Sequence, residues 1–219
     1  MSSYKTPDFW SLKAQKEGYP ARSVYKLKEM DEKFGLLRFR RGGKKPAFPA
    51  KSPAGGAVFK ALDLGAAPGS WSLYVLRKLG GVGFLAAADL SPLSRQYDQG
   101  LFEGDRFFFI RGDITTAETR EAILARGPYH LVMSDAAPAT SGNRSVDTLR
   151  SLALAEAVLE YAETVLIKEG NLIVKVFQGG ETPDILRRIQ KLFNTGKSFK
   201  PAACRPGSFE TYYVGLGKK

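Results

Sequence analysis

Residues 61–72 read ALDLGAAPGSWS, and this stretch decides the fold. An apolar run over 58–64 leads into a turn that contains glycine and proline, and helix-forming residues resume at Ser72. This order predicts a buried strand, a turn of small residues and a helix. In an open α/β sheet such a turn lies at the carboxyl end of a parallel strand, in the crevice where ligands bind.

The residues around this turn indicate what kind of ligand it binds. Gly65 and Gly69 let the backbone approach a ligand closely, and Asp63 can fix the turn by accepting its N–H groups. Any strand-to-helix turn would share these features, but Asp89 ends the next apolar run, over 82–88, where a carboxylate can hold the two ribose hydroxyls of a nucleotide-like cofactor. We therefore expect a nucleoside cofactor. The GxGxxG fingerprint and the Walker A loop are both absent, which disfavours a dinucleotide.

The rest of the chain alternates between strand and helix patterns, which predicts a parallel sheet covered by helices on both faces. The expected strands are 58–64, 83–89, 106–111, 129–134 and 170–177, and the expected helices are 70–79, 116–125, 146–168 and 182–193. Two further strand-like pieces, near 197–201 and 211–216, have no helix between them, so the last strand is expected to run antiparallel. The predicted fold class is α/β, with residues 58–219 as one globular catalytic unit.

Basic residues are concentrated before this unit. The 219 residues carry a net charge of +11, and residues 1–56 contribute +8 of it. Thr6 and Pro7 are expected to begin a helix that ends at Gly18, and a second helix is expected over 22–34. Residues 38–56 combine glycine, proline and basic side chains, which is typical of a flexible loop. We expect residues 1–57 to form a basic, helical RNA-binding extension.

Two side-chain patterns within this extension favour different roles. Five aromatic residues interleave with the charges and could stack on bases: Tyr4, Phe9, Trp10, Tyr19 and Tyr25. The alternative is that the basic face only makes the protein soluble. The apolar residues of the second helix fall at helical spacing and should face the main domain: Val24, Leu27, Met30 and Phe34. Lys26 lies off this stripe and alone predicts an ordinary solvated lysine.

Composition excludes several classes of protein. The chain has no membrane-length apolar stretch and no apolar signal segment near its first residue, so we expect a cytoplasmic protein with no membrane partner. A single cysteine, Cys204, excludes an intramolecular disulfide and a cysteine-rich metal site. The single histidine, His130, leaves zinc without ligands, so no metal is expected, and His130 itself should be packed or solvated.

Acidic residues end four of the predicted strands, at Asp63, Asp89, Asp113 and Asp135. Each alone could be a helix N-cap. Because the carboxyl ends of parallel strands meet at one edge of a sheet, together they describe an edge lined with acceptors. Such an edge suits a cationic or donor-rich ligand such as a ribose, an adenine amine and a sulfonium.

Lys175 interrupts the apolar run NLIVKVF over 171–177, which should be a central strand buried on both faces. The side chain either extends out from the strand end or pairs with a carboxylate, for which Asp135 on the neighbouring strand is the candidate. A partly desolvated lysine beside carboxylates can become a general base or a positioning donor.

Four motifs, in this order along the chain, resemble the RrmJ/FtsJ group of S-adenosylmethionine-dependent ribose 2′-O-methyltransferases: SVYKL, GAAPGSW, MSDAAP and VKVFQG. The resemblance runs from about Asp8 to the last residues. It implies a Rossmann-like methyltransferase sheet of seven strands with the last one antiparallel. It also implies a catalytic tetrad of Lys26, Asp135, Lys175 and Glu210.

For the cofactor, S-adenosylmethionine, the resemblance implies binding by residues of the turn and of the strand ends: Gly65, Pro68, Gly69, Trp71, Asp89, Asp113 and Asp135. Asp89 would hold the ribose, Asp113 would lie near adenine, and Asp135 would lie beside the methionine portion. The sequence departs from the group at Phe209, where a basic residue is common, and in the length of the 38–56 segment.

The expected reaction is in-line attack of a ribose 2′-oxygen on the methyl carbon of the sulfonium. Lys175 would take up the hydroxyl proton or steer the oxygen, Asp135 would set its charge and orientation, and Lys26 and Glu210 would bind the target nucleotide. We expect a monomer that acts on a uridine of 23S rRNA in the large ribosomal subunit, with tRNA and then an mRNA cap as alternative substrates. A non-catalytic RNA-binding or ribosome-assembly factor and an NAD-dependent dehydrogenase are the rival classes.

Overall fold

The computed structural model describes residues 7–38, 59–139, 141–179, 182–205 and 207–219. One sheet contains the strands β1 (Phe59–Leu64), β2 (Gly83–Asp89), β3 (Phe107–Arg111), β4 (Tyr129–Ser134), β5 (Leu166–Phe177), β6 (Phe193–Phe199) and β7 (Glu210–Lys218). Their order across the seven-stranded sheet is β3-β2-β1-β4-β5-β7-β6. The pairs from β3 to β5 are parallel, and β7 is antiparallel to both of its neighbours, which confirms the predicted topology.

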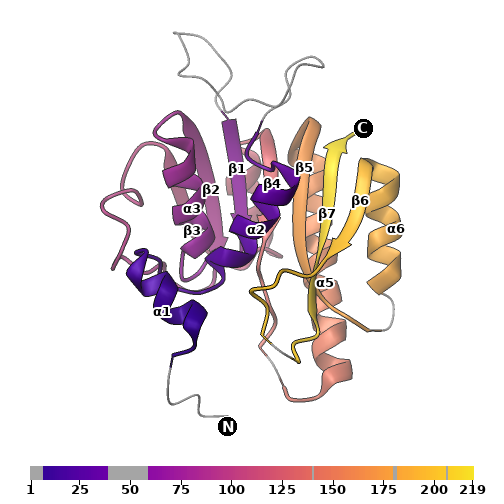
Figure 1. The fold of residues 1–219 in the computed structure, drawn as a ribbon. Coiled ribbons are helices and arrows are strands. Elements are labelled where there is room, and N and C mark those ends of the chain that lie inside the picture. Colours follow the sequence, from indigo (N-terminus) through magenta and orange to yellow (C-terminus); the bar gives the residue numbers. More distant parts are fainter. Residues whose placement is uncertain (1–6, 39–58, 140, 180–181, 206) are drawn as a thin grey trace.

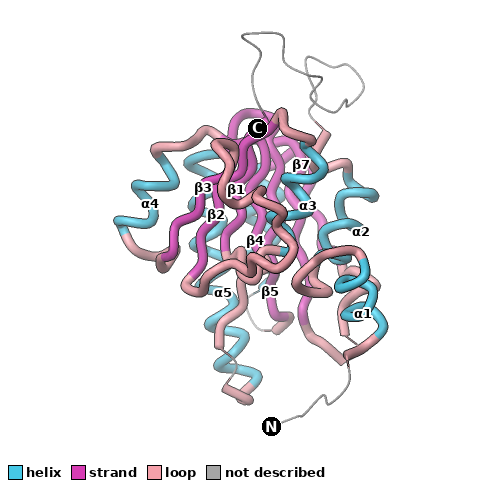
Figure 2. The backbone as a smooth tube through the Cα atoms, turned by 90° about the vertical axis from the view of Figure 1, so that its left-hand side faces the viewer, coloured by secondary structure: helices cyan, strands magenta, loops and turns pink. Residues whose placement is uncertain are grey.

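Helices cover both faces of this sheet, as predicted (Figure 2). The described helices are α1 (Phe9–Lys16), α2 (Val24–Phe34), α3 (Ser70–Leu79), α4 (Ala117–Leu124), α5 (Arg144–Val165) and α6 (Thr182–Leu192). α1, α2 and α3 lie on one face, and α4, α5 and α6 pack on the other. None of the helices in the described ranges is both long enough and apolar enough to cross a membrane.

Alternation along the strands builds a separate apolar core on each face of the sheet. On β1, Phe59 and Ala61 belong to the core under α2 and α3, whereas Leu62 and Leu64 belong to the core under α5. The predicted apolar stripe of α2 is confirmed, because Val24, Leu27 and Met30 are fully buried in the first core and Phe34 packs against it. The two N-terminal helices therefore share the core of the sheet.

The N-terminal helix begins later than predicted. Its N-cap is Asp8, whose carboxylate accepts a hydrogen bond from the Ser11 N–H at 2.9 Å, so Pro7 precedes the helix. α1 ends at Lys16, before Gly18 takes a positive φ of 72°. Thr6 lies outside the described residues, as do Tyr4, Val58 and all of the predicted 38–56 loop except Arg38.

The long helix α5 differs from the prediction at both ends. It begins at Arg144 because Asn143 caps it, accepting from the N–H groups of the two residues that follow Arg144. It ends at Val165, where the Lys218 ammonium donates to the carbonyls of Ala162 and Glu163 in the last turn and of Leu166, the first residue of β5. β6 likewise begins directly after α6 rather than near 197.

The carboxyl ends of the parallel strands meet at one edge of the sheet, the lower edge in Figure 1. Three segments from distant parts of the chain lie along this edge: α1, the connection between β6 and β7, and the first half of α5. The predicted ligand-binding turn, residues 65–69, is at the same edge because it follows β1 directly. This edge is therefore where the candidate site residues can meet.

Candidate active site

A cavity of about 620 Å³ lies at the carboxyl ends of β1, β2, β3 and β4 and is closed on one side by α5. Four of the predicted cofactor residues line it, namely Gly65, Asp89, Asp113 and Asp135. Its size is in the range of small-molecule sites. Leu90, which is 65% exposed, also lines the cavity and gives it an apolar surface beside the carboxylates. A flat base and a donor-rich ribose or amine fit this combination.

The turn after β1 has its shape because of contacts that only glycine permits. Gly65 has a φ of +78°, and a Cβ at this position would lie 2.5 Å from the Cβ of Ala136. Asp89 ties the turn to β2: one carboxylate oxygen accepts from the Ala67 N–H at 2.9 Å and the other from the Ser91 N–H at 2.7 Å. Each of these oxygens has a second lone pair that can accept from a ligand hydroxyl.

Pro68, Gly69 and Trp71, also predicted to bind the cofactor, are not among the residues that line this cavity. Gly69 is the left-handed N-cap of α3. The Trp71 indole N–H donates to the Ser23 carbonyl at 2.8 Å, and its ring packs near Tyr212 in the core under α2. The structure therefore places the Trp71 side chain between α3 and α2, where it holds the two helices together.

Asp113 and Asp63, at the other two strand ends, occupy opposite environments. Asp113 is exposed, and hydrogen bonds from the backbone and side chain of Thr115 hold its pKa below the usual value. Asp63 is fully buried and accepts from the Ser72 hydroxyl at 2.7 Å, and burial raises its pKa to about 7. Asp63 is not among the cavity-lining residues, so the predicted row of four acceptors contributes three carboxylates to the cavity.

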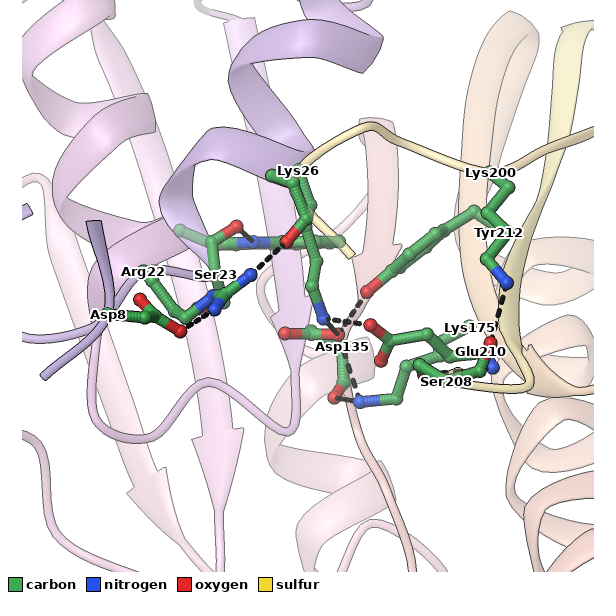
Figure 3. Close-up of polar contacts among 12 residues, drawn as sticks. Asp8, Arg22, Ser23, Lys26, Asp135, Lys175, Lys200, Ser208, Glu210 and Tyr212 are labelled. Atoms are coloured by element: carbon green, nitrogen blue, oxygen red, sulfur yellow. Dashed lines mark hydrogen bonds and ion pairs between the residues drawn. The ribbon is translucent and has the colours of Figure 1, made fainter. Parts of the chain in front are cut away.

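Lys26, Asp135, Lys175 and Glu210 converge from α2, the end of β4, β5 and the start of β7 (Figure 3). The Lys175 ammonium lies 2.9 Å from Oδ1 of Asp135 and also donates to the Asp135 carbonyl. The Lys26 ammonium lies 2.9 Å from Oε1 of Glu210 and 4.0 Å from Oδ1 of Asp135. Two cations and two anions thus form one connected cluster, and Lys26 is not the solvated lysine that the helix pattern alone suggested.

The charges of this cluster stabilise one another in a nearly dry environment, because Lys26 is 8% exposed and Lys175 is 7% exposed. Desolvation opposes the ionisation of Asp135, yet the charges of Lys175 and Lys26 keep its pKa below the usual value. Desolvation likewise opposes the charge on Lys26, but Asp135 and Glu210 raise its pKa above the usual value. Asp135 is therefore a carboxylate and Lys26 an ammonium at neutral pH.

Tyr212 belongs to the cluster and was not predicted. Its hydroxyl donates to Oδ1 of Asp135 at 2.6 Å, and its backbone is the register partner of Lys175 across the β5–β7 pair. Burial and the nearby Asp135 charge raise the Tyr212 pKa well above the usual value, so the hydroxyl remains a donor. The available signal was its spacing: two residues after Glu210 on a strand, it faces the same side as Glu210.

A second cavity, of about 230 Å³, adjoins the cluster and shares no lining residue with the first. Lys26 and Glu210 line it, together with Arg22 and Arg205. Arg22 is held by an ion pair to Asp8 at the start of α1 and donates to the Ala203 carbonyl at 2.6 Å (Figure 3). The cluster thus stands between a cavity rich in carboxylates and a smaller one rich in cations.

Of the other predicted residues, two tyrosines and the histidine are packed against the rest of the protein. Tyr19 and Tyr25 are each 6% exposed, because the two N-terminal helices pack together and Lys28 covers both rings, so they are not available to stack on bases as predicted. Phe9, at 69% exposed, remains open to solvent. His130 accepts from the Lys60 N–H at 3.0 Å and stacks on a phenylalanine, which confirms that it is packed. No cluster of metal-ligating side chains is found in the described segments.

A sheet with this strand order, a single reversed strand and a nucleoside-sized cavity at its carboxyl edge defines the chain as a Rossmann-like methyltransferase. The sequence model of the FtsJ-like methyltransferase family matches residues 19–218. The chain belongs to that family, which confirms the resemblance seen in the four motifs.

Similar proteins agree with this assignment. The chain is 46% identical, over all of its length and 98% of the relative, to the ribosomal RNA large subunit methyltransferase E of Treponema denticola. Among solved structures it is similar to a Plasmodium falciparum protein described as a ribosomal RNA methyltransferase, with a TM-score of 0.69, 22% identity and coverage of 91% of this chain and 98% of that one.

A more distant match is human methyltransferase-like protein 13, solved in complex with SAH, with a TM-score of 0.51, 16% identity and coverage of 73% and 72% of the two chains. At this identity the match concerns the fold alone. The family and the fold together support the prediction of S-adenosylmethionine as the cofactor.

Proposed function

We propose that this protein transfers the methyl group of S-adenosylmethionine to a ribose 2′-hydroxyl of ribosomal RNA, at a uridine of 23S rRNA in the large subunit. The observation that carries the proposal is the buried Lys175–Asp135 pair, 2.9 Å apart, between a carboxylate-lined cavity and a cationic one. The name of the Treponema denticola relative, 46% identical over the whole chain, supports the choice of large-subunit rRNA. Such a substrate would place the enzyme in the cytoplasm, where we propose that it acts as a monomer.

The residues of the larger cavity fit the proposed cofactor. The Asp89 carboxylate, already anchored by two backbone N–H groups, would accept the ribose hydroxyls, and the ionised Asp113 would accept from the adenine amine. Leu90 offers its exposed apolar surface to the base. Asp135 lies at the end of the cavity nearest the lysines and would hold the methionine portion. When bound, the cofactor supplies an electrophilic methyl group on a sulfonium.

Lys175 is the residue proposed to contact the reacting hydroxyl. Two of its N–H bonds are directed to the carbonyl and carboxylate oxygens of Asp135, which leaves one position of the nitrogen for the substrate. As a neutral amine Lys175 would accept the 2′-hydroxyl proton there, and as an ammonium it would orient the oxygen for in-line attack. Asp135 fixes the nitrogen, and Tyr212 fixes Asp135.

The smaller cavity would hold the target nucleotide. Lys26 and Glu210 would contact its ribose from the wall that the cavity shares with the cluster. The guanidinium groups of Arg22 and Arg205 would bind the adjoining phosphates, for which their fork geometry is suited. The rest of the RNA would then extend over the basic N-terminal helices.

The proposal is tested by tritiated methyl transfer to large ribosomal subunits, with tRNA and capped mRNA measured in parallel. Wild type is compared with Lys175→Ala and with the control Lys168→Ala, which changes an exposed lysine at the opposite end of β5. We expect label in 23S rRNA from wild type and from the control, and none from Lys175→Ala, with cofactor affinity unchanged in all three. Label in tRNA alone would refute the substrate, and loss of cofactor binding in Lys175→Ala would refute the catalytic role.

A further inference from the structure

Arg144 and Phe209 form a contact beside the active site that the proposed mechanism does not use. The Arg144 guanidinium lies 5.2 Å from the centre of the Phe209 ring, and that ring packs edge-on against Phe177 with centroids 4.7 Å apart. Phe177 is 8% exposed and ends β5, so the Phe209 ring rests on a fixed support. The three side chains form a stack that runs from the core to an exposed guanidinium.

The position of this stack relative to the cluster follows from the strand register. Phe209 immediately precedes Glu210, and Glu210 pairs with Phe177, two residues after Lys175 on β5. The backbone carbonyl of Phe209 accepts from the Gln178 N–H at 2.8 Å, which fixes the chain just before Glu210. The guanidinium of Arg144, the first residue of α5, is therefore held beside the residue that precedes Glu210.

The interactions within the protein do not account for a cation at this place. In the part of the chain that the structure describes, Arg144 makes no ion pair with a carboxylate. It is the first residue of α5, where the helix dipole disfavours positive charge. A guanidinium stacked on an aromatic ring keeps its planar edge and its N–H groups available to an anion. Such a group suits the phosphates of a nucleic acid.

We propose that Arg144, positioned by Phe209, binds a phosphate of the RNA strand on the far side of the target nucleotide from Arg22. Arg22 lies in the layer of α1 and α2, and Arg144 belongs to α5 in the opposite layer. The RNA strand then crosses the carboxyl edge of the sheet from one layer to the other, with the target ribose at the cluster between the two arginines. This inference rests on the proposed RNA substrate and adds the path of the strand.

The same arrangement gives a phenylalanine a role at position 209, where the family resemblance predicts a basic residue. The positive charge comes from a different element, the start of α5, and Phe209 supplies the surface on which it lies. Neither residue lines the cofactor cavity, so changing them should leave cofactor binding intact.

The test measures binding of a 23S rRNA fragment as a function of salt, together with kcat, KM and cofactor affinity, for wild type, Arg144→Gln, Arg144→Lys and Phe209→Leu. Lys168→Gln removes one positive charge at the opposite end of β5 and is the matched control. One phosphate contact on a single strand contributes about four-fold to affinity at roughly 0.15 M salt, because log K falls with log salt with a slope of about −0.7 per contact. Arg144→Gln should therefore weaken binding about four-fold and reduce the slope by about 0.7.

The variants separate this inference from the proposed function. In Arg144→Gln we expect the KM for RNA to rise while kcat and cofactor affinity stay constant. Arg144→Lys should retain the salt slope, and Phe209→Leu should lose part of the RNA affinity. If wild type methylates RNA but Arg144→Gln behaves like Lys168→Gln, the phosphate contact is refuted. It is also refuted if Arg144→Lys loses the slope. If wild type neither binds nor methylates RNA, the proposed function itself fails.

Discussion

Removing the charge of Lys26 should destabilise the fold as well as the site, since the lysine neutralises two carboxylates that have little access to water. The variant Lys26→Met keeps much of the length and apolar stem of the side chain and deletes the ammonium. Glu210, whose side chain is 13% exposed, then loses its cation at 2.9 Å. Asp135, whose side chain is 17% exposed, keeps Lys175 at 2.9 Å but faces an uncompensated Glu210.

The magnitude follows from this burial. Breaking a buried ion pair by removing one partner costs about 3–5 kcal/mol. Because Glu210 borders the smaller cavity and retains some solvent contact, we expect the lower end, about 3 kcal/mol. For a chain of this size each kcal/mol lowers Tm by about 2–4 °C, so the expected decrease is about 6–12 °C. The double variant Lys26→Met/Glu210→Gln removes the stranded charge and should recover about 2 kcal/mol of this loss.

The assay is urea and thermal unfolding at pH 7 of wild type, both single variants and the double variant. Lys28→Met is the control, because Lys28 lies on the same helix and pairs with Glu17 nearer the surface, where ion pairs contribute less than about 1 kcal/mol. Two results would refute this reasoning. One is that the effects of Lys26→Met and Glu210→Gln on the free energy of unfolding are additive. The other is that Lys26→Met loses no more stability than the Lys28→Met control.

Three further predictions concern single side chains. Tyr212→Phe removes a hydrogen bond to the charged Asp135, which is worth about 1.5–3 kcal/mol. Single-turnover methyl transfer should therefore slow by about ten-fold or more at unchanged cofactor affinity. An unchanged rate would contradict the role of Tyr212 in fixing Asp135. The pKa of Asp63 is raised from 3.8 to about 7, so folding stability should fall as the pH rises from about 4 to 7 and level off above pH 7. Urea unfolding at pH 5 and 7.5 should therefore show a smaller pH dependence for Asp63→Asn than for wild type. An equal dependence would show that Asp63 is not the group that causes it. Gly65→Ala places a Cβ 2.5 Å from that of Ala136 and should lower the cofactor affinity, measured by calorimetry, more than ten-fold. A variant with wild-type affinity would show instead that the turn tolerates a side chain.

The sequence predicted the sheet and two members of the cluster, Lys175 and Asp135, for identifiable physical reasons. Strand-helix alternation and the apolar runs set the topology, and Lys175 was conspicuous because a charge inside a buried strand requires a partner. Asp135 was then the nearest candidate at a neighbouring strand end. Both inferences depend on local pattern, and the structure places the two side chains 2.9 Å apart.

The remaining cluster residues depend on contacts between distant segments. Lys26 looked solvated because helical periodicity does not reveal that Glu210, at the start of β7, lies within ion-pair distance of it, and its role came only from the resemblance. Tyr212 was overlooked because tyrosine is common in strands. Its spacing puts it on the same side of the strand as Glu210, but only the β5–β7 register sets it opposite Lys175. Trp71 belongs to the GAAPGSW motif, but its indole N–H donates to the carbonyl of Ser23, the residue before α2, and its side chain does not line the cavity.

The two cavities beside the cluster have no lining residue in common, and this separation bears on the order of events in a catalytic cycle. With the cofactor in the larger cavity and the target nucleotide in the smaller one, as proposed, we expect spent cofactor to dissociate and be replaced while the RNA stays bound. The two substrates would then bind in random order, and the products would dissociate in random order. A non-reactive cofactor analogue would then be a competitive inhibitor when the cofactor is varied. When RNA is varied, it would lower the maximal velocity and leave the KM for RNA unchanged.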